Sequence, residues 1–404
     1  MKIRPFYDIV VVGSGPAGSM TALYAAKNGA SVLILERDRE VGIPVRCAEG
    51  ISKRGLEKFF QPDERWIAQK IDGAKLYAPN GQFCIMTAGA VGDGYVLERR
   101  LFDAFICEQA TKNGADILTK ADAHGLLYDN DKLSGVIFTH HGEEKQVKAH
   151  IIVGADGTES RIGKLAGIDT TLTLKDIEPS VQYLLTDINL NDKLTHFYFG
   201  NEIAPGGYVW VFPKGRNIAN VGIGLRADKS NGKNAQHYLD DFIEKNFPES
   251  SSLSFIAGAV PTAKTLPEIT RDNLMLVGDA ARQVNPVTGG GLSNILVAGS
   301  IAGTVAAEAI KKEDFSNKFL KKYHKQWMKE KGNHQKVHYK LKEVFFDFTD
   351  DELNKTVGLL HDIPHHFFSS QQARVNSPLI FHSHRYHLLL DHPRHVELKR
   401  FYAG

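Results

Sequence analysis

A glycine-rich turn near the amino end constrains the fold of this chain more than any other feature. It lies in YDIVVVGSGPAGSMTALYAAKNGASVLILE, residues 7–36, where Gly13, Gly15 and Gly18 keep the spacing G-x-G-x-x-G. In that arrangement the first glycine permits a tight turn, and the second lets a pyrophosphate approach the backbone. The third lets a helix pack close to a strand. The turn therefore predicts an α/β unit that binds a dinucleotide.

The residues around the turn support this prediction. Ile9–Val12 is a short continuous apolar run, which is typical of a buried parallel strand. A helix is expected from about Ala17 to Asn28, and Gly29 follows it as a helix-ending glycine. A glycine turn in an ordinary α/β unit is the alternative, but the strand, turn and helix together favour the dinucleotide site.

An acidic residue at the end of the next strand limits which dinucleotide the turn can bind. The strand Ser31–Leu35 ends at Glu36, eighteen residues after Gly18 and close to the ~20 expected for a carboxylate that binds a ribose. An acid here favours a ribose with a free 2′-hydroxyl. The ligand is thus predicted to be FAD or NAD rather than NADP.

The totals restrict the class of protein. A chain of 404 residues is too long for one simple core, so we expect two or three domains. The net charge of +2 gives no overall case for nucleic acid as a partner. Cys47, Cys84 and Cys107 form no disulfide pattern, and the apolar start, which runs into a glycine turn, is not typical of a signal peptide. A soluble protein of a reducing compartment is predicted.

Two later turns repeat the pattern of a strand that ends in glycine and aspartate. The first is Gly154–Gly157, which contains Asp156, and the second is Gly278–Asp279. The second leads through Gly289–Gly291 into a helix. Exposed backbone amides at such a helix start attract an anion and would stabilise the negative edge of a reduced flavin.

The middle of the chain differs from the glycine-rich parts. Residues 171–264 alternate apolar and polar positions with few helix signals, so a mostly antiparallel sheet is expected, and residues 61–95 also predict strands. Tyr208, Trp210 and Phe212 fall on one face of a strand. They are either plain sheet core or one wall of a pocket for an apolar or aromatic substrate.

Cys47 lies in the segment Pro44–Gly50, which breaks the strand and helix pattern. Because Arg46 precedes it, its thiol could have a lowered pKa. A buried structural cysteine in a turn is the equal alternative, and these residues alone do not decide between the two.

The last third is predicted to be helical. Leu292–Ala307 has no charge and carries Gly299 and Gly303, but it is shorter than the ~20 residues of a membrane span. We expect a buried helix packed closely on a sheet. After Lys311, an amphipathic helix with aromatic residues at every fourth position is expected to dock on the protein, or else to lie on an anionic membrane surface; these residues are Phe315, Phe319, Tyr323 and Trp327.

Eleven of the seventeen histidines fall between His324 and His395. Because no cysteine is near and Pro364 interrupts the helical spacing, no metal site is predicted, and a polar or pH-sensitive surface is favoured.

The three glycine and acid turns, together with Pro44–Gly50 (P-x-x-C-x-E-G) and Tyr208-x-Trp210-x-Phe212-Pro213, resemble the geranylgeranyl reductase family. This family belongs to the p-hydroxybenzoate-hydroxylase-like FAD superfamily, and the chain is similar to its archaeal members that act on ether phospholipids. The resemblance implies a mixed α/β (α+β) fold. A Rossmann-like FAD-binding domain would comprise residues 1–60, 96–170 and 265–312, and an inserted antiparallel-sheet substrate domain residues 61–95 and 171–264. Residues 313–404 would form a helical region.

The resemblance also implies roles for individual residues. The residues implied to hold FAD are Gly13, Gly15, Ala17, Gly18, Glu36, Cys47, Ala48, Gly50, Arg99, Ala123, Asp279, Gly291 and Leu292. Beside these implied roles, we expect Cys47 to be the catalytic candidate near the flavin, for gating or proton delivery, and Tyr208, Trp210 and Phe212 to bind the substrate.

The implied reaction is the saturation of C=C bonds in geranylgeranyl chains by hydride from N5 of reduced FAD, acting on a geranylgeranyl ether lipid or geranylgeranyl diphosphate. NAD(P)H or ferredoxin would supply the electrons, since no second dinucleotide motif is present. We expect a cytoplasmic protein, with peripheral contact at the inner face of the cell membrane left open. The alternatives are a flavin-dependent monooxygenase or halogenase of the same fold, and a non-catalytic prenyl-lipid carrier.

Overall fold

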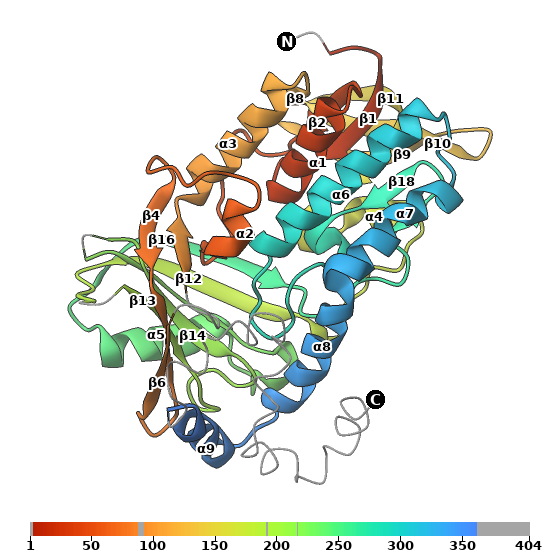
Figure 1. Cartoon of the computed structure of the whole chain (residues 1–404). Helices are drawn as coiled ribbons and strands as arrows, with labels where there is room; N and C mark the ends of the chain where they lie inside the picture. The colour runs from red at the N-terminus through yellow and green to blue at the C-terminus, as the bar shows by residue number, and fades with distance from the viewer. Residues whose placement is uncertain (1–2, 88–92, 191–192, 216, 362–404) are drawn as a thin grey trace.

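The computed structural model describes residues 3–87, 93–190, 193–215 and 217–361. Within them the chain forms two large sheets, one small sheet and a column of helices that runs alongside both large sheets (Figure 1). The predicted mixed α/β fold is confirmed.

The first large sheet contains the glycine-rich turn. Its main strand order is β17-β18-β11-β1-β2-β8, and β9 and β10 extend it through β11. The central strand β1 pairs in parallel with β2 and β11, and Ile9, Val10 and Val11 are fully buried. An unbroken apolar run suits this strand because both faces of a parallel sheet are covered. The strands are β1 (Phe6–Val12), β2 (Val32–Leu35), β8 (Asp116–Leu118), β9 (Ala121–Asp129), β10 (Lys132–His140), β11 (Glu143–Gly154), β17 (Thr270–Arg271) and β18 (Leu274–Leu276).

The second large sheet is mostly antiparallel, with the order β16-β12-β15-β14-β13-β5-β6. Its exception is the pair of β5 and β13, which run in parallel. A small sheet of order β3-β7-β4 is separate from it. The second sheet comprises β5 (Gly73–Tyr77), β6 (Phe83–Thr87), β12 (Glu178–Thr186), β13 (Leu194–Tyr198), β14 (Tyr208–Pro213), β15 (Ala219–Gly224) and β16 (Ser251–Val260), and the small sheet β3 (Gly50–Ser52), β4 (Ile67–Ile71) and β7 (Gly94–Leu97).

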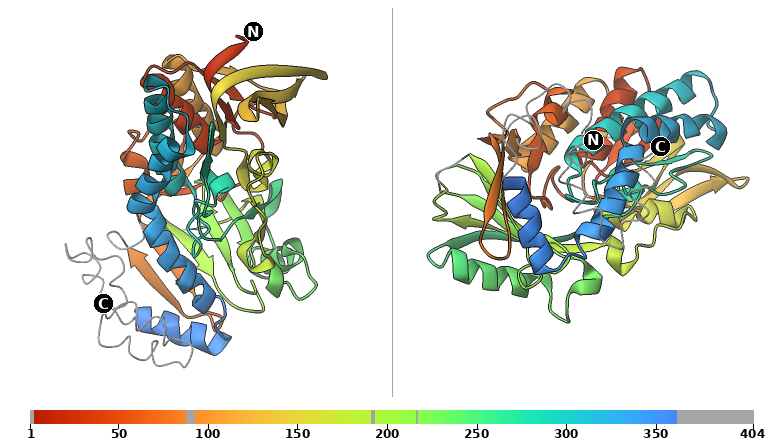
Figure 2. Two further views of the ribbon diagram at one scale, coloured as in Figure 1. Left: turned by 90° about the vertical axis from the view of Figure 1, so that its right-hand side faces the viewer. Right: turned by 60° about the horizontal axis from the view of Figure 1, so that its bottom comes forward.

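Helices α1, α3 and α6 cover one face of the first sheet, and the arm of β9 and β10 lies on the other side (Figure 2). The column of α7, a π-helical turn η5 and α8 descends from there beside the second sheet (Figure 1). The helices are α1 (Pro16–Lys27), α2 (Lys53–Glu57), α3 (Arg99–Lys112), α4 (Arg161–Leu165), α5 (Ala235–Asn246), α6 (Leu292–Lys311), α7 (Asn317–Trp327), η5 (Met328–Gly332), α8 (Asn333–Phe345) and α9 (Asp350–His361).

Helix α6 is buried, as predicted, but its glycines pack it on α1 rather than on a sheet. A Cβ on Gly299 would lie 2.6 Å from Cβ of Met20, and one on Gly303 would lie 2.2 Å from the carbonyl oxygen of Thr21. The two glycines therefore bring the helices into close contact. Among the described helices, α6 alone has the length and apolar composition of a membrane span, and 56% of that stretch is buried inside the protein.

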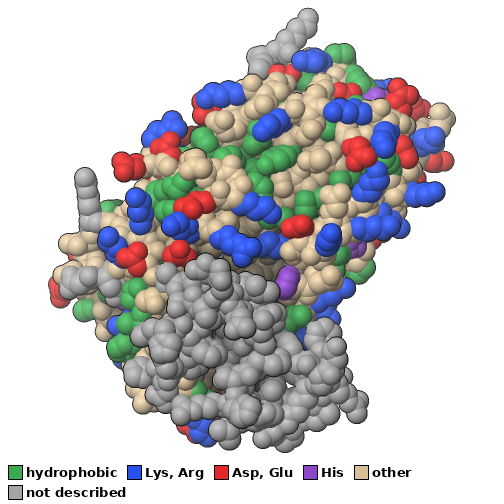
Figure 3. Space-filling view, in the orientation of Figure 1, with side chains coloured by type: hydrophobic (Ala, Val, Ile, Leu, Met, Phe, Trp, Pro, Cys, Tyr) green, Lys and Arg blue, Asp and Glu red, His purple; other side chains and the backbone are tan. Residues whose placement is uncertain are grey.

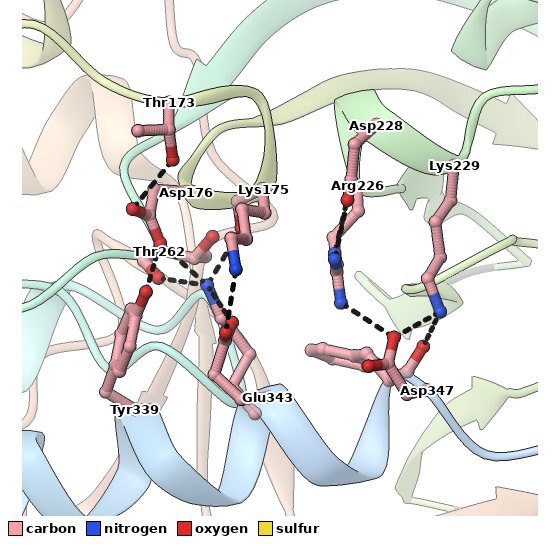
Figure 4. Close-up of polar contacts among 12 residues, drawn as sticks. Thr173, Lys175, Asp176, Arg226, Asp228, Lys229, Thr262, Tyr339, Glu343 and Asp347 are labelled. Atoms are coloured by element: carbon pink, nitrogen blue, oxygen red, sulfur yellow. Dashed lines mark hydrogen bonds and ion pairs between the residues drawn. The ribbon is translucent and has the colours of Figure 1, made fainter.

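The aromatic face of α7 docks on the protein. Phe319, Tyr323 and Trp327 are buried, so the first of the two predicted arrangements of this helix is confirmed. Helix α8 makes both apolar and polar contacts with the second sheet and the segments next to its strands. The ring of Phe345 lies edge-on to that of Phe199, at 5.5 Å. Tyr339 donates to Asp176, while Arg226 and Lys229 pair with Asp347 just beyond the helix (Figure 4).

Helix α5 was not predicted, since residues 171–264 show few helix signals. It covers the face of the second sheet that carries Val209 and Val211, and it buries Tyr238, Leu239 and Phe242 there. Strands β4 and β7, from the predicted substrate domain 61–95 or its border, lie in the small sheet rather than in the large one. The domain bounds themselves stay a prediction, and most of the histidine-rich region lies outside the described residues.

Candidate active site

The glycine-rich turn has the geometry that its spacing predicts. Gly13 has a φ of 101°, and a Cβ there would lie 2.4 Å from the carbonyl oxygen of Ala155. A Cβ on Gly18 would lie 1.9 Å from the carbonyl oxygen of Gly13, so this glycine lets α1 approach β1. A Cβ on Gly15 would meet nothing within 4 Å. Gly13 and Gly18 thus serve packing, while Gly15 faces open space where a ligand can approach the backbone.

Glu36 is buried at the end of β2 and holds the turn. One carboxylate oxygen accepts hydrogen bonds from the backbone nitrogen and the hydroxyl of Ser14, at 2.8 and 2.6 Å. The other accepts from the backbone nitrogen of Asp38 at 2.8 Å. The acid therefore fixes the conformation of the glycine-rich turn, and its predicted contact with a ribose stays a prediction.

Asp279 lies in the third glycine turn, beside the first. A Cβ on Gly278 would lie 2.7 Å from Cβ of Ala17, so the two turns touch. Oδ1 of Asp279 is buried without a hydrogen-bond partner and faces Gly291, whose added Cβ would lie 3.8 Å from it. Burial raises the pKa of this carboxyl to about 6, opposed by the charge of Arg99.

These features fit FAD. A buried carboxylate oxygen without a partner is costly unless a ligand donates to it, and the ribityl and ribose hydroxyls of FAD are such donors. Gly15 leaves room for a pyrophosphate, and Gly291 caps the start of α6, where backbone amides favour an anion. The turn that carries Gly13, Gly15, Ala17 and Gly18 therefore lies next to Gly278 and Asp279, and Asp279 lies next to Gly291, which precedes Leu292 at the start of α6.

Replacing Asp279 with asparagine should stabilise the apoprotein while weakening FAD binding. Because the folded pKa is raised above the ordinary value of about 3.9, the buried charge lowers stability as the pH rises from about 4 to 6, and the full cost persists above that. We expect the free energy of unfolding of the variant to be about 1–2 kcal/mol higher at pH 7.5 and unchanged at pH 4. Urea denaturation of apoprotein at both pH values measures this, and a less stable variant at pH 7.5 would contradict it.

The Cys47 loop is held by a buried acid that the sequence analysis did not select. One carboxylate oxygen of Glu49 accepts from Asn220 at 2.6 Å and from Lys214 at 2.7 Å, and the other accepts from the backbone nitrogen of Arg99 at 2.8 Å. Glu49 has a φ of 73°, so the backbone takes a left-handed turn here. The acid in P-x-x-C-x-E-G thus joins this loop to β15 and to the start of α3.

Burial raises the pKa of the Cys47 thiol, while Arg99 opposes this shift. The expectation of a lowered pKa from Arg46 is wrong, because Arg99 rather than Arg46 is the cation near the sulfur and burial outweighs it. Arg99 is itself engaged in a buried ion pair with Asp103 at 2.7 Å. Cys47 is therefore a protonated thiol at neutral pH.

Tyr208, Trp210 and Phe212 share one face of β14, as their spacing predicts, and they pack with Ala48 and Phe197. The ring of Phe197 lies edge-on, 5.4 Å from the rings of both Tyr208 and Phe212. We call these four aromatic side chains the aromatic wall: Phe197, Tyr208, Trp210 and Phe212.

The aromatic wall contacts both loops of the predicted FAD site. The hydroxyl of Tyr208 donates to the carbonyl of Thr288, just before the three glycines that lead into α6. A Cβ on Gly50 would lie 2.8 Å from the ring of Phe212. Beyond Tyr208 the apolar lining continues into a small cavity between β13 and α8, which sequence reasoning missed; it includes Phe199, Phe345, Phe346 and Phe348.

Comparison with known proteins identifies the family. Residues 176–260 match the geranylgeranyl reductase catalytic domain, and residues 8–55 match the FAD dependent oxidoreductase family. A digeranylgeranylglycerophospholipid reductase of Methanococcoides burtonii is 44% identical over 359 residues, which are 88% of each protein. The chain belongs to the digeranylgeranylglycerophospholipid reductase family. A family member from Methanocella arvoryzae is 43% identical, over 88% of this chain and 92% of its own.

Solved structures agree with this digeranylgeranylglycerophospholipid reductase family assignment. A geranylgeranyl bacteriochlorophyll reductase-like protein from Thermoplasma acidophilum has a TM-score of 0.87 and 37% identity, over 93% of this chain and 96% of that one. The flavin-dependent brominase Bmp2 has a TM-score of 0.68 at 16% identity, over 92% of this chain and 100% of that one, and shares the fold alone. FAD as the cofactor follows from the family.

In this member of the digeranylgeranylglycerophospholipid reductase family, the remaining implied FAD contacts lie on other elements than the glycine turns. Arg99 lies beside Cys47, and Gly50 packs on Phe212. Ala123 lies in β9, where it pairs with Phe138 of β10 and is buried. The assignment of these residues to FAD stays a prediction.

Trp210 depends on a glycine of the neighbouring strand. Its indole nitrogen donates to Gln182 at 2.9 Å, and a Cβ on Gly222 would lie 2.4 Å from its ring. Replacing Gly222 with alanine should displace the indole and lower the rate of lipid reduction about tenfold or more, because placement of the alkene governs the reaction. Replacing Gly224 with alanine is the control, since a Cβ there would lie 3.2 Å from the hydroxyl of Ser180 and 3.7 Å from the ring of Trp210, which is an ordinary contact distance. Steady-state rates with retained flavin measure the difference, and equal rates in the two variants would contradict it.

Proposed function

We propose that the protein is an FAD-dependent reductase that saturates C=C bonds in the geranylgeranyl chains of archaeal-type ether lipids. The relatives from Methanococcoides burtonii and Methanocella arvoryzae carry the name of this activity. The observation that carries the proposal is the aromatic wall, which contacts both the Cys47 loop and the glycine-rich start of α6. An apolar surface at this place suits an isoprenoid chain, which offers no polar group to bind.

The residues of the chain would bind FAD, orient the alkene and exclude water from the site. Gly13, Gly15, Glu36 and Asp279 would hold FAD, which when bound supplies the hydride for saturation of the alkene. The aromatic wall would fix the alkene and exclude water, and this matters because an isolated C=C bond is poorly polarised. Gln182 would support the wall from behind, since it accepts from Trp210 and donates to the carbonyl of Cys47 at 3.3 Å.

The deciding experiment is anaerobic. The flavin of the purified protein is reduced chemically and mixed with a geranylgeranyl ether lipid, and mass spectrometry follows the lipid. Reoxidation of the flavin together with mass gains of two hydrogens is the expected result. If the flavin stays reduced with lipid and reacts only when air is added, a monooxygenase or halogenase takes the place of the reductase. A colourless protein that still binds lipid would be a carrier.

Cys47 is proposed to act in the reaction, by gating the site or by delivering a proton. Its protonated, half-buried thiol beside Arg99 supports a proton-holding role. We expect Cys47→Ser to keep the flavin and to lose at least about tenfold in single-turnover lipid reduction, since a general acid contributes a factor of about a hundred or more. Full turnover in this variant would remove Cys47 from the mechanism.

The electron donor and the location complete the proposal. NAD(P)H or ferredoxin would reduce the flavin, and anaerobic mixing with each donor distinguishes them by the rate of flavin bleaching.

The protein would be cytoplasmic and would touch the inner face of the membrane to reach its lipid. Because the aromatic face of α7 is buried, its exposed lysines rather than its rings would make that contact. Unchanged liposome binding after Lys321 and Lys325 are changed to glutamine would count against this.

A further inference from the structure

Basic side chains from two distant parts of the sequence meet beside the Cys47 loop. Arg54 belongs to α2 and Lys58 directly follows its end, whereas Lys331 belongs to the π-helical turn η5 and His334 and His338 to α8. A band of Lys and Arg side chains crosses this face of the molecule (Figure 3). We call these residues the cation cluster: Arg54, Lys58, Lys331, His334 and His338.

Lys331 is the centre of the cation cluster and has no partner within it. Its pKa is lowered by burial and by the neighbouring charges of Lys58 and Arg54, and only Glu330 opposes this. Within the described part of the chain, the side chains of Lys331 and Arg54 have no hydrogen bond and no ion pair. A half-buried ammonium surrounded by like charge is unfavourable unless an anion joins it.

The acids near the cluster do not neutralise it. The carboxylate of Glu330 lies 3.9 Å from the ammonium of Lys58. Lys331 therefore remains under the repulsion of the positive charges of Lys58 and Arg54. Glu57, on α2, accepts a hydrogen bond from the hydroxyl of Tyr95 at 2.7 Å. Among the residues that the structure describes, Glu330 is thus the acid that pairs with this cluster, and positive charge exceeds negative charge here.

His334 and His338 extend the cluster along α8. They follow Lys331 by three and seven residues, a spacing that places side chains on one side of a helix. Burial, His334 and Lys331 lower the pKa of His338, so these groups are near one another. Imidazole N–H groups can donate to an anion in the neutral state as well as the charged one.

The position of α2 is fixed tightly beside the active site. A Cβ on Gly55 would lie 2.0 Å from the hydroxyl oxygen of Ser293, in the first turn of α6, and the hydroxyls of Ser52 and Ser293 are 3.3 Å apart. Helix α2 also follows directly on β3, which begins at Gly50. The cluster therefore lies at the edge of the site that holds the Cys47 loop. Lys331 occupies a π-helical turn, a local distortion that is frequent at functional sites.

We propose that the cation cluster binds the phosphate headgroup of the lipid substrate, whose isoprenoid chains extend to the aromatic wall. This inference rests on the proposed function. A phosphate carries the charge that the cluster lacks, and its oxygens accept from guanidinium, ammonium and imidazole together. Binding the headgroup at the edge of the site would hold a membrane lipid while its chains reach the reacting position.

The test uses the holoenzyme and a non-reducible probe, so that binding is measured apart from turnover. The probe is a saturated diphytanylglycerol lipid with a phosphate headgroup, and the reference is the same lipid with a free hydroxyl. Dissociation constants are measured for Lys331→Met and for the double variant Arg54→Gln, Lys58→Gln. Lys132→Gln, an exposed change on β10 far from the cluster, is the control.

Each cluster variant should weaken binding of the phosphate lipid about tenfold or more, because it removes charged hydrogen-bond donors to the phosphate. Binding of the hydroxyl lipid should not change, and the control should match the wild type. The proposal would be overturned if the variants weakened the binding of both lipids equally, or if they weakened the binding of neither lipid. Binding of inorganic phosphate as tight as that of the phosphate lipid would also overturn it, by assigning the cluster to free phosphate.

Two further measurements separate this inference from its premise. In one outcome the variants bind lipid normally, but an acidic iron–sulfur protein reduces their flavin more slowly than that of the wild type. The cluster is then a docking surface for the electron donor, and the headgroup assignment fails. If the wild type does not reduce a geranylgeranyl ether lipid, the proposed function fails. The binding constants of the saturated probes still decide whether the cluster recognises phosphate.

Discussion

Replacing Gly18 with alanine is expected to destabilise the apoprotein by about 3 kcal/mol or more. A Cβ at this position would lie 1.9 Å from the carbonyl oxygen of Gly13, a backbone atom that cannot move without opening the turn. Helix α1 must then shift away from β1, and the close contacts between α1 and α6 through Gly299 and Gly303 are lost with it. Urea denaturation of the FAD-free protein measures the change in the free energy of unfolding.

Gly15→Ala is the matched control for this result. A Cβ on Gly15 would meet nothing within 4 Å, and the residue has a φ of −57°, which alanine adopts without strain. Its stability should therefore equal that of the wild type, whereas the dissociation constant of FAD should rise about tenfold or more as the methyl group occupies the space of the pyrophosphate. Equal loss of stability in both variants, or tight FAD binding by Gly15→Ala, would contradict these separate roles.

Replacing Lys342 with methionine should cost about 3–5 kcal/mol of stability. The side chain is 0% exposed, and its ammonium donates to the carbonyls of Lys175 and Thr262, each at 2.9 Å, and to Asp176 at 3.1 Å. Methionine keeps the length and the apolar stem but removes the donor of two carbonyls and the positive charge beside Asp176, whose carboxylate keeps its hydrogen bonds from Tyr339 and Thr173. Helix α8 would then lose its central attachment to the segment before β12.

The pH dependence gives this result a second readout. Tyr339 and Lys342 lower the pKa of Asp176 against the opposing effect of burial. A carboxyl with a lowered pKa adds stability that is present above its ordinary pKa of about 3.9 and is lost as the pH falls through the lower folded value. In Lys342→Met the free energy of unfolding should fall less than in the wild type as the pH is lowered through this range. Lys336→Met, an exposed change on the same helix, should alter neither stability nor its pH dependence, and a similar loss in this control would contradict the assignment.

The parts of the fold that sequence reasoning predicted are those encoded locally. The turn at Gly13–Gly18 fixes its own strand and helix, and the alternation along β14 fixes which face carries Tyr208, Trp210 and Phe212. Helix α5 was missed although it carries a local signal. Asn234 caps it by accepting from the backbone nitrogen of His237, and apolar side chains follow at helical spacing.

Other features could not be predicted because their partners are distant in the sequence. Glu49 is one acid among many until folding places Asn220 and Lys214 beside it. Lys342 reads as one more lysine in a basic helix, and only its docking against Thr262 makes it a buried attachment. The cation cluster depends in the same way on the meeting of α2 with the turn at Lys331.

The strand order of the first sheet also determines when this protein can fold during its synthesis. The sheet begins with β1 at residue 6, yet β18, which covers one edge of β11, ends only at residue 276. Until that part of the chain has left the ribosome, the last three residues of β11, 152–154, remain unpaired on this edge and can associate with strands of other chains. The FAD-binding unit that starts the sequence is thus completed late, and the nascent chain should depend on chaperones through most of its translation.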